Sequence, residues 1–514
     1  MAYVPVTAVW EITMGCNMRC GHCGSSCAEP LPDELTTEEA LRVIEDMAAL
    51  GMRYITLSGG EPLLRRDWPV LAGHLTRHGI APNIITNGWL VDEQMVRTAD
   101  ANGVQTISIS LDGTRETHDA IRRNGAFDRA LRAFDVLDAA RHVSGANTTV
   151  TKLNIGELEA IREILIAHGV DLWQIQIGLP MGTLAQHREQ VLEPEAVEYL
   201  LEFSHQTTLA GRIKVFPADC LGYFTAKESQ TRSLSLGSFE PVVWQGCNAG
   251  KRSFGLLHNG DVVGCTSIRQ PEFIEGNIRE RSLRQIWEDP GAFAWSRGMK
   301  KTDLSGDCRE CCYGDVCLGG CPNTRLTIHG TIHAGTEYCA FHLAMDETRR
   351  ALARYDDPEV LLQTARTYQS QDKGQLAYLT LQRAAALDPA HADVQALLGF
   401  AAFSIGNFEA CLTANQAVLD RDPGNAYALK GMGLALHRLS RSEEGLQHLH
   451  RATERAGPAE QDSFYDLAVV YRELGRPMDA RAALERGAQR FPGFMQRAGG
   501  LYAQVLQEAA IQRP

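Results

Sequence analysis

The 514-residue chain lacks the features that mark membrane and secreted proteins. No apolar run approaches the ~18 residues that a membrane-spanning helix needs. The N-terminal segment, MAYVPVTAVWEITMGC, has no basic start followed by an apolar core, as a secretory signal would. The formal charge is −13, from 63 acidic and 50 basic residues, which disfavours a basic nucleic-acid-binding surface. We therefore expect a soluble cytoplasmic protein that binds neither a membrane nor nucleic acid.

The composition is typical of a globular protein with several domains. Hydrophobic residues make up 44% of the sequence and charged residues 22%, so the chain can bury several cores. At about 150 residues per domain, the length predicts three or four domains. Three stretches differ in their pattern, and we predict domains over residues 1–235, 236–350 and 355–514.

The first 180 residues alternate short β-rich runs with amphipathic helical stretches. The β-rich runs are residues 7–12, 54–57, 83–85, 106–110, 147–151 and 173–177. This alternation predicts a parallel α/β sheet covered by helices, closed as a partial (β/α)6 barrel similar to a TIM barrel. In such a barrel the active site lies at the carboxyl ends of the strands. Distinctive residues follow four of the six predicted strands, at 16–23, 59–62, 86–88 and 110–113.

Residues 355–514 contain an internal repeat rich in Ala, Leu and Arg. Helix-turn-helix units begin near residues 358, 392, 426 and 461, and a closing helix is predicted near 495–512. Small residues recur at the eighth and twentieth positions of each unit, where they let paired helices approach closely. This pattern resembles the tetratricopeptide repeat (TPR) family, which implies an all-α solenoid. Asn415 stands where the other three units have leucine.

The chain has 14 cysteines, and most of them fall in two groups. In a reducing cytosol, clustered thiols indicate metal or redox chemistry rather than disulfides. Cys16, Cys20 and Cys23 place three thiolates within eight residues after a predicted strand. Three thiolates leave one iron of a four-iron cubane open to bind a ligand. A structural zinc site is the alternative, for which Cys27 would supply the fourth ligand.

This C-x3-C-x2-C spacing resembles the signature of the radical SAM superfamily, and the resemblance covers residues 1–180. The family usually has an aromatic residue before the last cysteine, where this chain has His22. The resemblance implies contacts with S-adenosylmethionine (SAM) by His22, Gly59, Gly60, Glu61, Pro62, Asn87, Ser110, Asp112 and Arg122. The Gly-Gly-Glu run is expected to bind the methionine amino group, because glycines permit close backbone approach and a carboxylate suits an ammonium.

The same resemblance implies a reaction. A [4Fe–4S] cluster on Cys16, Cys20 and Cys23 cleaves SAM reductively, with an electron from a flavodoxin- or ferredoxin-type donor. The resulting 5′-deoxyadenosyl radical removes a hydrogen atom from the substrate, while the barrel orients it and excludes water. The sequence indicates no general acid or base.

The second cysteine group resembles the SPASM domain, the auxiliary-cluster extension of many peptide-modifying radical SAM enzymes. Seven cysteines occur in the order and spacing of that domain: Cys247, Cys265, Cys308, Cys311, Cys317, Cys321 and Cys339. The resemblance implies two auxiliary [4Fe–4S] clusters, and hence three clusters in the chain. A zinc-ribbon-like structural element is the alternative, because CxxC pairs bind zinc well.

The resemblance assigns Cys247, Cys265 and Cys321 to the first auxiliary cluster and the other four cysteines to the second. The first set is one thiolate short. Either Cys220, the only upstream candidate, closes this cluster, or one iron stays open for substrate, and we favour Cys220. Cys312 receives no role. Cys411 occupies a small-residue position of a repeat and is expected to be buried.

These resemblances predict a radical SAM/SPASM enzyme that crosslinks or otherwise functionalises a C–H bond in a ribosomally made peptide (a RiPP maturase). The alternatives are a maturase of a larger partner enzyme, of sulfatase or quinoprotein type, and a non-catalytic metal-stabilised repeat scaffold. Thr266 stands where sulfatase maturases carry aspartate, which disfavours that type. Only 15 residues precede Cys16, so we expect no leader-binding domain before the barrel. The repeats are predicted either to capture a peptide in their groove or to serve as a docking or oligomerisation arm.

Overall fold

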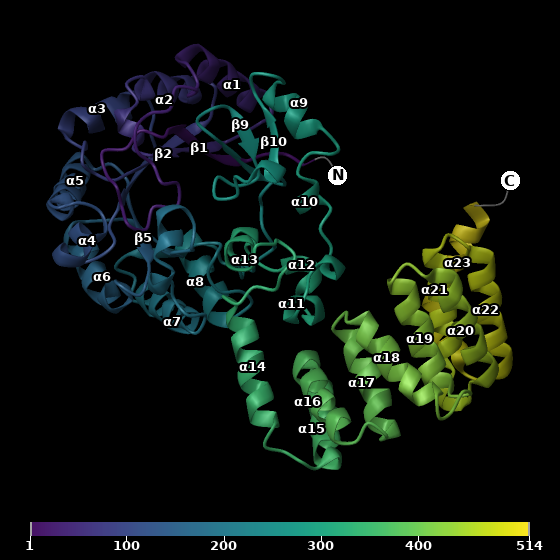
Figure 1. Cartoon of the computed structure of the whole chain (residues 1–514). Helices are drawn as coiled ribbons and strands as arrows, with labels where there is room; N and C mark the ends of the chain where they lie inside the picture. The colour runs from purple at the N-terminus through teal and green to yellow at the C-terminus, as the bar shows by residue number, and fades with distance from the viewer. Residues whose placement is uncertain (1–2, 512–514) are drawn as a thin grey trace. The chain divides into compact units, whose positions relative to one another are not determined.

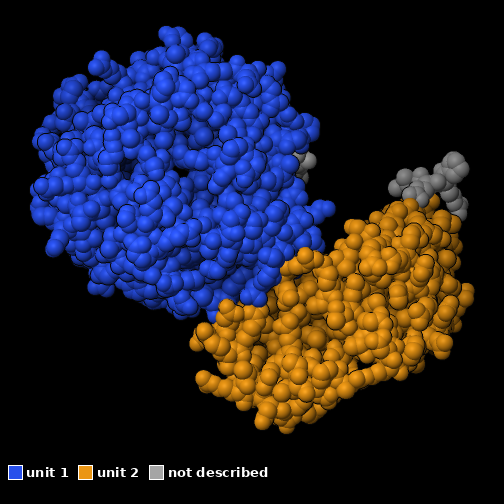
Figure 2. All heavy atoms as spheres, viewed as in Figure 1, with its two compact units in different colours: residues 1–308, 314–343 blue, residues 309–313, 344–514 orange. Residues whose placement is uncertain are grey.

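The structure is a computed structural model that describes residues 3–511. It contains two compact units, coloured separately in Figure 2. The first unit comprises residues 1–308 and 314–343, and the second comprises 309–313 and 344–514. The barrel and most of the cysteine-rich segment thus form one body. None of the helices within residues 3–511 is long and apolar enough to cross a membrane.

A curved sheet forms the centre of the first unit, and its strand order is β10-β9-β8-β1-β2-β3-β4-β5-β6-β7. The six predicted strands are β1 (Thr7–Thr13), β2 (Tyr54–Gly59), β3 (Ala81–Thr86), β4 (Thr106–Ser110), β5 (Ser144–Val150) and β6 (Leu172–Ile177). They pair in chain order, and each pairing is parallel, which confirms the predicted α/β barrel.

The sheet extends beyond the six predicted strands at both edges. β7 (Lys214–Pro217) pairs in parallel with β6, and β8 (Ser253–Leu256) pairs in parallel with β1. β9 (Asp261–Val263) and β10 (Ile274–Asn277) continue from β8 as antiparallel strands. These runs are too short to show a clear alternating pattern in the sequence. The cysteine-rich segment therefore begins as an extension of the barrel sheet and not as a separate body.

Helices surround the outside of the sheet (Figure 1). The barrel helices are α1 (Thr37–Ala49), α2 (Trp68–Arg77), α3 (Glu93–Ala101), α4 (Arg115–Ile121), α5 (Ala126–Ala140), α6 (Leu158–Ala167), α7 (Ala196–Leu209) and α8 (Ala226–Leu236). Short helices follow in the cysteine-rich segment: α9 (Leu283–Glu288), α10 (Ala294–Arg297), α11 (Asp307–Glu310), α12 (Gly314–Cys317), α13 (Pro322–His329) and α14 (Ala340–Leu352). The first barrel helix begins at a capping box formed by Thr36 and Glu39.

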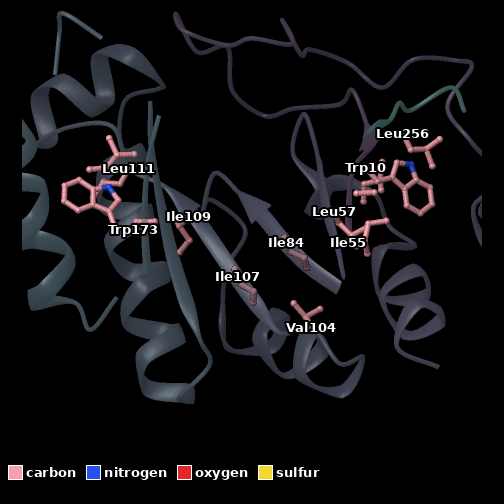
Figure 3. Close-up of a cluster of buried hydrophobic side chains, with 14 of the residues drawn as sticks. Trp10, Ile55, Leu57, Ile84, Val104, Ile107, Ile109, Leu111, Trp173 and Leu256 are labelled. Atoms are coloured by element: carbon pink, nitrogen blue, oxygen red, sulfur yellow. The ribbon is translucent and has the colours of Figure 1, made fainter. Parts of the chain in front are cut away.

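Alternation along the strands separates the apolar core from the barrel interior. In two of the strands, fully buried side chains occur two residues apart. They are Ile55 and Leu57 in β2, and Ile107 and Ile109 in β4, and Figure 3 shows them among the core side chains. They belong to one cluster with buried residues of the surrounding helices. Because successive strand residues point to opposite faces, the strand residues that alternate with these core side chains face the barrel interior. Ser58 and Ser110 are two such residues, and both line the cavity described below.

The second unit is helical throughout residues 358–511, apart from short connections. Its helices are α15 (Pro358–Ser370), α16 (Gly374–Leu387), α17 (Ala392–Ser404), α18 (Phe408–Leu419), α19 (Ala426–Arg438), α20 (Ser442–Arg455), α21 (Asp462–Glu473), α22 (Pro477–Arg490) and α23 (Phe494–Ile511). The predicted starts of the four helix pairs are confirmed to within a residue. Residue 512, where we expected the last helix to end, lies outside the described residues.

Small residues allow the close packing that the repeat pattern predicted. A Cβ atom on Gly433 would lie 2.7 Å from the carbonyl oxygen of Gly445, and one on Gly445 would lie 2.6 Å from that of Gly433. Cys411 is 1% exposed, as expected for its position. Asn415 is also buried and donates to the carbonyl oxygen of Cys411 at 2.8 Å.

A short piece of the cysteine-rich segment, residues 309–313, packs within the second unit. Arg309 pairs with Glu409 at 3.0 Å, and the backbone N–H of Cys312 donates to Oε1 of Gln375 at 3.3 Å. Cys312 also packs against the apolar core of the first repeats. This contact gives Cys312 a structural environment that the sequence did not indicate.

Candidate active site

A cavity of about 480 Å³ opens at the carboxyl ends of the barrel strands. Cysteines of both groups line it: Cys16, Cys20, Cys23, Cys27, Cys220, Cys265 and Cys321. Polar side chains from neighbouring strands complete much of the wall: Ser58, Ser110, Asn147, Thr149, Gln174 and Gln176. The barrel therefore gathers thiols that lie far apart in the sequence around one polar chamber.

The loop after β1 carries the first cysteine group and is closed at its base. The N–H of Cys16 donates to the carbonyl oxygen of Ala28 at 2.6 Å, and the N–H of Ala28 donates to that of Met14 at 3.1 Å. Burial raises the pKa of Cys16, and it raises the pKa of Cys20 to about 11. A buried thiol of this kind keeps its proton until a cation replaces it, which fits the role of a metal ligand.

Cys27 lies beside Cys23, and hydrogen bonding from its thiol lowers the pKa of Cys23. The zinc alternative requires Cys27 to join the other three thiols around one ion. Zn–S bonds of about 2.3 Å bring tetrahedral ligands to within about 3.8 Å of one another. In the described chain, no three of these four thiols lie within 4.8 Å of one another.

Two glycines hold the end of β2 against the cysteine loop. A Cβ atom on Gly59, whose φ is +134°, would lie 2.2 Å from the carbonyl oxygen of Thr13, and one on Gly60 would lie 2.3 Å from that of Gly15. Both glycines line the cavity. Only glycine permits this approach, so the pair serves the loop packing as well as any ligand.

Glu61 differs from the expectation that its carboxylate contacts SAM. The side chain is fully buried and does not line the cavity, and neither does Pro62. Its oxygens accept hydrogen bonds from Thr86 Oγ1 and the N–H of Asn87, each at 2.8 Å. Burial raises its pKa to about 7. Glu61 thus positions the loop after β3, and its predicted contact with SAM stays a prediction.

Asp112 also differs from the expected SAM contact, because its carboxylate is occupied by the protein. Oδ2 lies 2.8 Å from Nε2 of His22 and accepts from Nε of Arg122 at 2.5 Å, while Oδ1 accepts from the N–H of Thr149 at 2.9 Å. Burial would raise the pKa of Asp112, but Arg122 and His22 hold it well below its usual range. Of the nine predicted SAM contacts, those that line the cavity are His22, Gly59, Gly60, Asn87, Ser110 and Arg122.

Three cysteines of the predicted first auxiliary set, Cys220, Cys265 and Cys321, also line the cavity, and Cys247 lies near them. Burial raises the pKa of Cys247 and Cys265, and raises that of Cys220 to about 12. The nearby sulfur of Cys321 raises all three pKa values further. The structure therefore brings Cys220 together with the other three cysteines of this set, at the end of β7.

The predicted second auxiliary set is divided between the two units. Cys308, Cys317 and Cys339 are buried in the first unit, where Cys317 and Cys339 share a cluster with Tyr223 and Trp244. The fourth member, Cys311, is buried within the segment of the second unit defined above. Their assignment to one cluster stays a prediction.

Comparison with known proteins identifies the family. Residues 10–165 match the radical SAM superfamily, and residues 247–312 match the iron-sulfur cluster-binding SPASM domain. The chain is 31% identical over 350 residues to the AdoMet-dependent heme synthase of Methanosarcina barkeri, which covers 66% of this chain and 98% of that enzyme. The chain belongs to the radical SAM superfamily. Enzymes of this superfamily use SAM and a [4Fe–4S] cluster, and the SPASM domain implies auxiliary iron-sulfur clusters.

A maturase and a protein crystallised with a precursor peptide are also similar to this radical SAM chain. It is 28% identical over 320 residues to mycofactocin maturase MftC of Mycobacterium ulcerans, which covers 62% of this chain and 83% of that one. The crystal structure of Streptococcus suis SuiB bound to precursor peptide SuiA has a TM-score of 0.53 at 16% identity, covering 65% of this chain and 75% of that one. The structural likeness shows a shared fold.

Some residues of this radical SAM cavity carried no motif in the sequence. Glu11, Met181, Asp219 and Arg269 all line it. Glu11 had one visible signal, since it is a lone charge inside the apolar strand run TAVWEIT. The other three lie in segments without a regular pattern, so only the folded chain reveals them.

Proposed function

We propose that this chain is a radical SAM/SPASM maturase that modifies a side chain of a ribosomally made peptide or of a protein. The observation that carries the proposal is one cavity lined by thiols of two predicted cluster sites. Cys16, Cys20 and Cys23 of the SAM-cluster set line it, together with Cys220, Cys265 and Cys321 of the first auxiliary set. A substrate group between them can meet the SAM side and the auxiliary side in one binding event.

We further propose three [4Fe–4S] clusters. Cys16, Cys20 and Cys23 hold the SAM-binding cluster, with its fourth iron open. The first auxiliary cluster has Cys220, Cys247, Cys265 and Cys321 as ligands, and the proximity of Cys220 to Cys321 supports full protein ligation. The second has Cys308, Cys311, Cys317 and Cys339. These three sets of cysteines fit [4Fe–4S] clusters, because such clusters are held by three or four thiolates.

When bound, SAM and its cluster supply a one-electron cleavage that yields a radical able to remove a hydrogen atom. The chain's own residues do the positioning. Gly59 and Gly60 leave backbone at the cavity surface, and Ser110, Asn87 and Arg122 offer polar atoms to the ligand. The strand residues of the interior would orient the substrate, and the partial barrel would shield it from water.

A peptide substrate is supported by the relatives and by the repeats. One relative is named as a maturase of mycofactocin, and the structurally similar protein SuiB was crystallised with its precursor peptide SuiA. We further infer that the helix pairs of the second unit stack as tetratricopeptide repeats, a solenoid whose concave face would suit an extended chain. A flavodoxin- or ferredoxin-type protein would supply the electron.

The direct test is anaerobic incubation of the reconstituted enzyme with SAM, a reductant and the short precursor peptide encoded beside its gene. The expected result is 5′-deoxyadenosine together with hydrogen loss from the peptide. A peptide deuterated at the modified position should transfer deuterium to 5′-deoxyadenosine. SAM cleavage with an unaltered peptide of every neighbouring reading frame would contradict a peptide substrate.

A tetrapyrrole is a second candidate substrate, favoured by one observation. One relative is the AdoMet-dependent heme synthase described above. This chain is 31% identical to it, and the alignment covers 98% of that enzyme. Fe-coproporphyrin III, the product named for another relative, is a suitable probe. A shift of its Soret band on binding, followed by its SAM-dependent conversion, would favour this candidate over a peptide maturase.

A further inference from the structure

One arginine joins the two cysteine-bearing loops across the cavity. Through a single nitrogen, Nη2, Arg269 donates to Oε1 of Glu11 at 2.9 Å and to Oγ of Ser25 at 3.0 Å. The same nitrogen donates to the carbonyl oxygen of Thr266 at 2.6 Å. Ser25 lies two residues after Cys23, and Thr266 directly follows Cys265. The contacts therefore link the loop of the first cysteine group to the loop of the first auxiliary set.

Glu11 completes this link from the barrel side. Oγ of Ser25 donates to the same Oε1 atom at 3.0 Å, so the carboxylate, the hydroxyl and the guanidinium form a closed triangle. Glu11 lies in β1 between the buried residues Trp10 and Ile12 and is only 4% exposed. A carboxylate at such a site is costly unless it is paired.

The pair also places a fixed positive charge beside the auxiliary set. The guanidinium of Arg269 donates to the carbonyl oxygen of Thr266, the residue directly after Cys265, so its charge lies next to the loop of the auxiliary set. An arginine stays protonated at all working pH values. Charge near an iron-sulfur cluster is one of the factors that set its reduction potential.

We propose that Glu11 and Arg269 are a positioning pair that fixes the spacing between the SAM-cluster loop and the first auxiliary-cluster loop, and that the charge of Arg269 raises the reduction potential of the auxiliary site. The inference rests on the proposed function only in that both sites hold clusters.

Three variants of the full-length reconstituted enzyme separate geometry from charge. Arg269→Gln removes both the positive charge and the guanidinium that donates to Glu11, Ser25 and Thr266. Arg269→Lys keeps the charge, but its shorter side chain places the donor nitrogen elsewhere and should not hold the same three contacts. Glu11→Gln keeps an acceptor oxygen and removes the negative charge. The matched control is Arg284→Gln, an exposed arginine of α9 whose partner is Glu288.

Two measurements need no substrate. Redox titration followed by electron paramagnetic resonance gives the auxiliary potential, and pulsed spectroscopy of the reduced clusters gives the distribution of their separation. Arg269→Gln should lower the potential and broaden the distribution. Arg269→Lys should broaden the distribution at nearly wild-type potential, and Glu11→Gln should raise the potential. The control should match wild type in both.

The outcomes are distinct. Unchanged potential and separation in both Arg269 variants would overturn the inference. Loss of iron from both variants would overturn it as well, since the pair would then be a requirement for folding. Absence of any cluster signal in the wild-type enzyme would instead overturn the proposed function, independently of these variants.

Discussion

Nε2 of His22 lies 2.8 Å from Oδ2 of Asp112, which ties the cysteine loop to the end of β4. The same oxygen accepts from Arg122, whose Nη1 is 4.0 Å from the sulfur of Cys20. His22 occupies the position where the superfamily usually has an aromatic residue, and here its ring forms a hydrogen bond with Asp112. The buried carboxylate therefore fixes both the loop and a cation beside its sulfurs.

Cys23→Ala should reduce SAM cleavage below detection, because the cluster that reduces SAM loses a ligand. Cys27→Ala is the matched variant, since its thiol lies beside Cys23. It should keep most of the cleavage activity. The measurement is 5′-deoxyadenosine formed with dithionite under anaerobic conditions. Equal loss in both variants would favour a four-thiolate site that includes Cys27.

Iron analysis should give about twelve irons in each reconstituted chain if all three sites are full cubanes. Replacing Cys16, Cys20 and Cys23 together by alanine should remove about four of them. Cys220→Ala should leave the SAM cluster intact and change the resonance signal of the first auxiliary cluster. Stoichiometric zinc in place of iron, or an unchanged signal in Cys220→Ala, would contradict these assignments.

Glu61→Ala should weaken SAM binding, because the loop after β3, part of which lines the cavity, loses the hydrogen bonds that hold it in place. The effect acts through Thr86 and Asn87, which lose their acceptor. Glu61→Gln keeps one acceptor oxygen and should bind SAM more tightly than the alanine variant. Equilibrium dialysis against labelled SAM measures both, with the exposed Glu93→Gln as the control. Wild-type affinity in Glu61→Ala would show that the loop does not depend on this carboxylate.

Asp466 in α21 should make the repeat unit less stable as the pH rises. Burial raises its pKa to about 6, although Lys430 at 3.7 Å opposes the shift. The stabilising contribution is therefore complete below about pH 4, the unfolded value, and is lost as the pH passes about 6. At pH 7, Asp466→Asn should stabilise this region by about 1–3 kcal/mol, with no difference at pH 4.

Hydrogen exchange of peptides from α21 measures this difference, because wild type and variant are compared at the same pH. The exposed Glu454→Gln in α20 is the control and should stay within about 0.5 kcal/mol at both pH values. Equal protection of wild type and Asp466→Asn at pH 7 would contradict the raised pKa.

Truncation should separate the repeats that support the cysteine-rich segment from those that remain available to substrate. A chain ending at residue 422 keeps α16 and α18, which contact residues 309–313, and should keep its iron and its substrate-free SAM cleavage. A chain ending at residue 350 should lose the iron that depends on Cys311. If the repeats capture the peptide, the 422 truncation should raise KM more than it lowers kcat. Unchanged KM would favour a docking arm.

The sequence predicted the barrel well where its signals were local. Six strands alternate clearly and are separated by amphipathic helices, so their order and parallel pairing followed directly. The cysteine spacings and the helix pairs are likewise local patterns. By contrast, β7 is only four residues long, and nothing in its sequence shows that pairing with β6 brings Cys220 to the same edge as Cys321.

Side-chain roles were harder to predict than positions. Glu61 and Asp112 lie where the motifs placed them, but both carboxylates turn to protein donors instead of the cavity. That choice depends on which donors the fold brings within reach, such as the N–H groups of Asn87 and Thr149. The link between Glu11 and Arg269 joins residues 258 positions apart and leaves no pattern in either segment.

The placement of residues 309–313 has a consequence for biosynthesis. A ribosome completes the barrel and Cys308 before it makes the helices against which Arg309 and Cys312 pack. The segment that carries Cys311 therefore reaches its folded position only after α16 and α18 have emerged. In the proposed second auxiliary cluster, Cys311 would therefore join Cys308, Cys317 and Cys339 only after these helices are made, and a nascent chain arrested before residue 375 would carry all four thiols without the packing that positions Cys311.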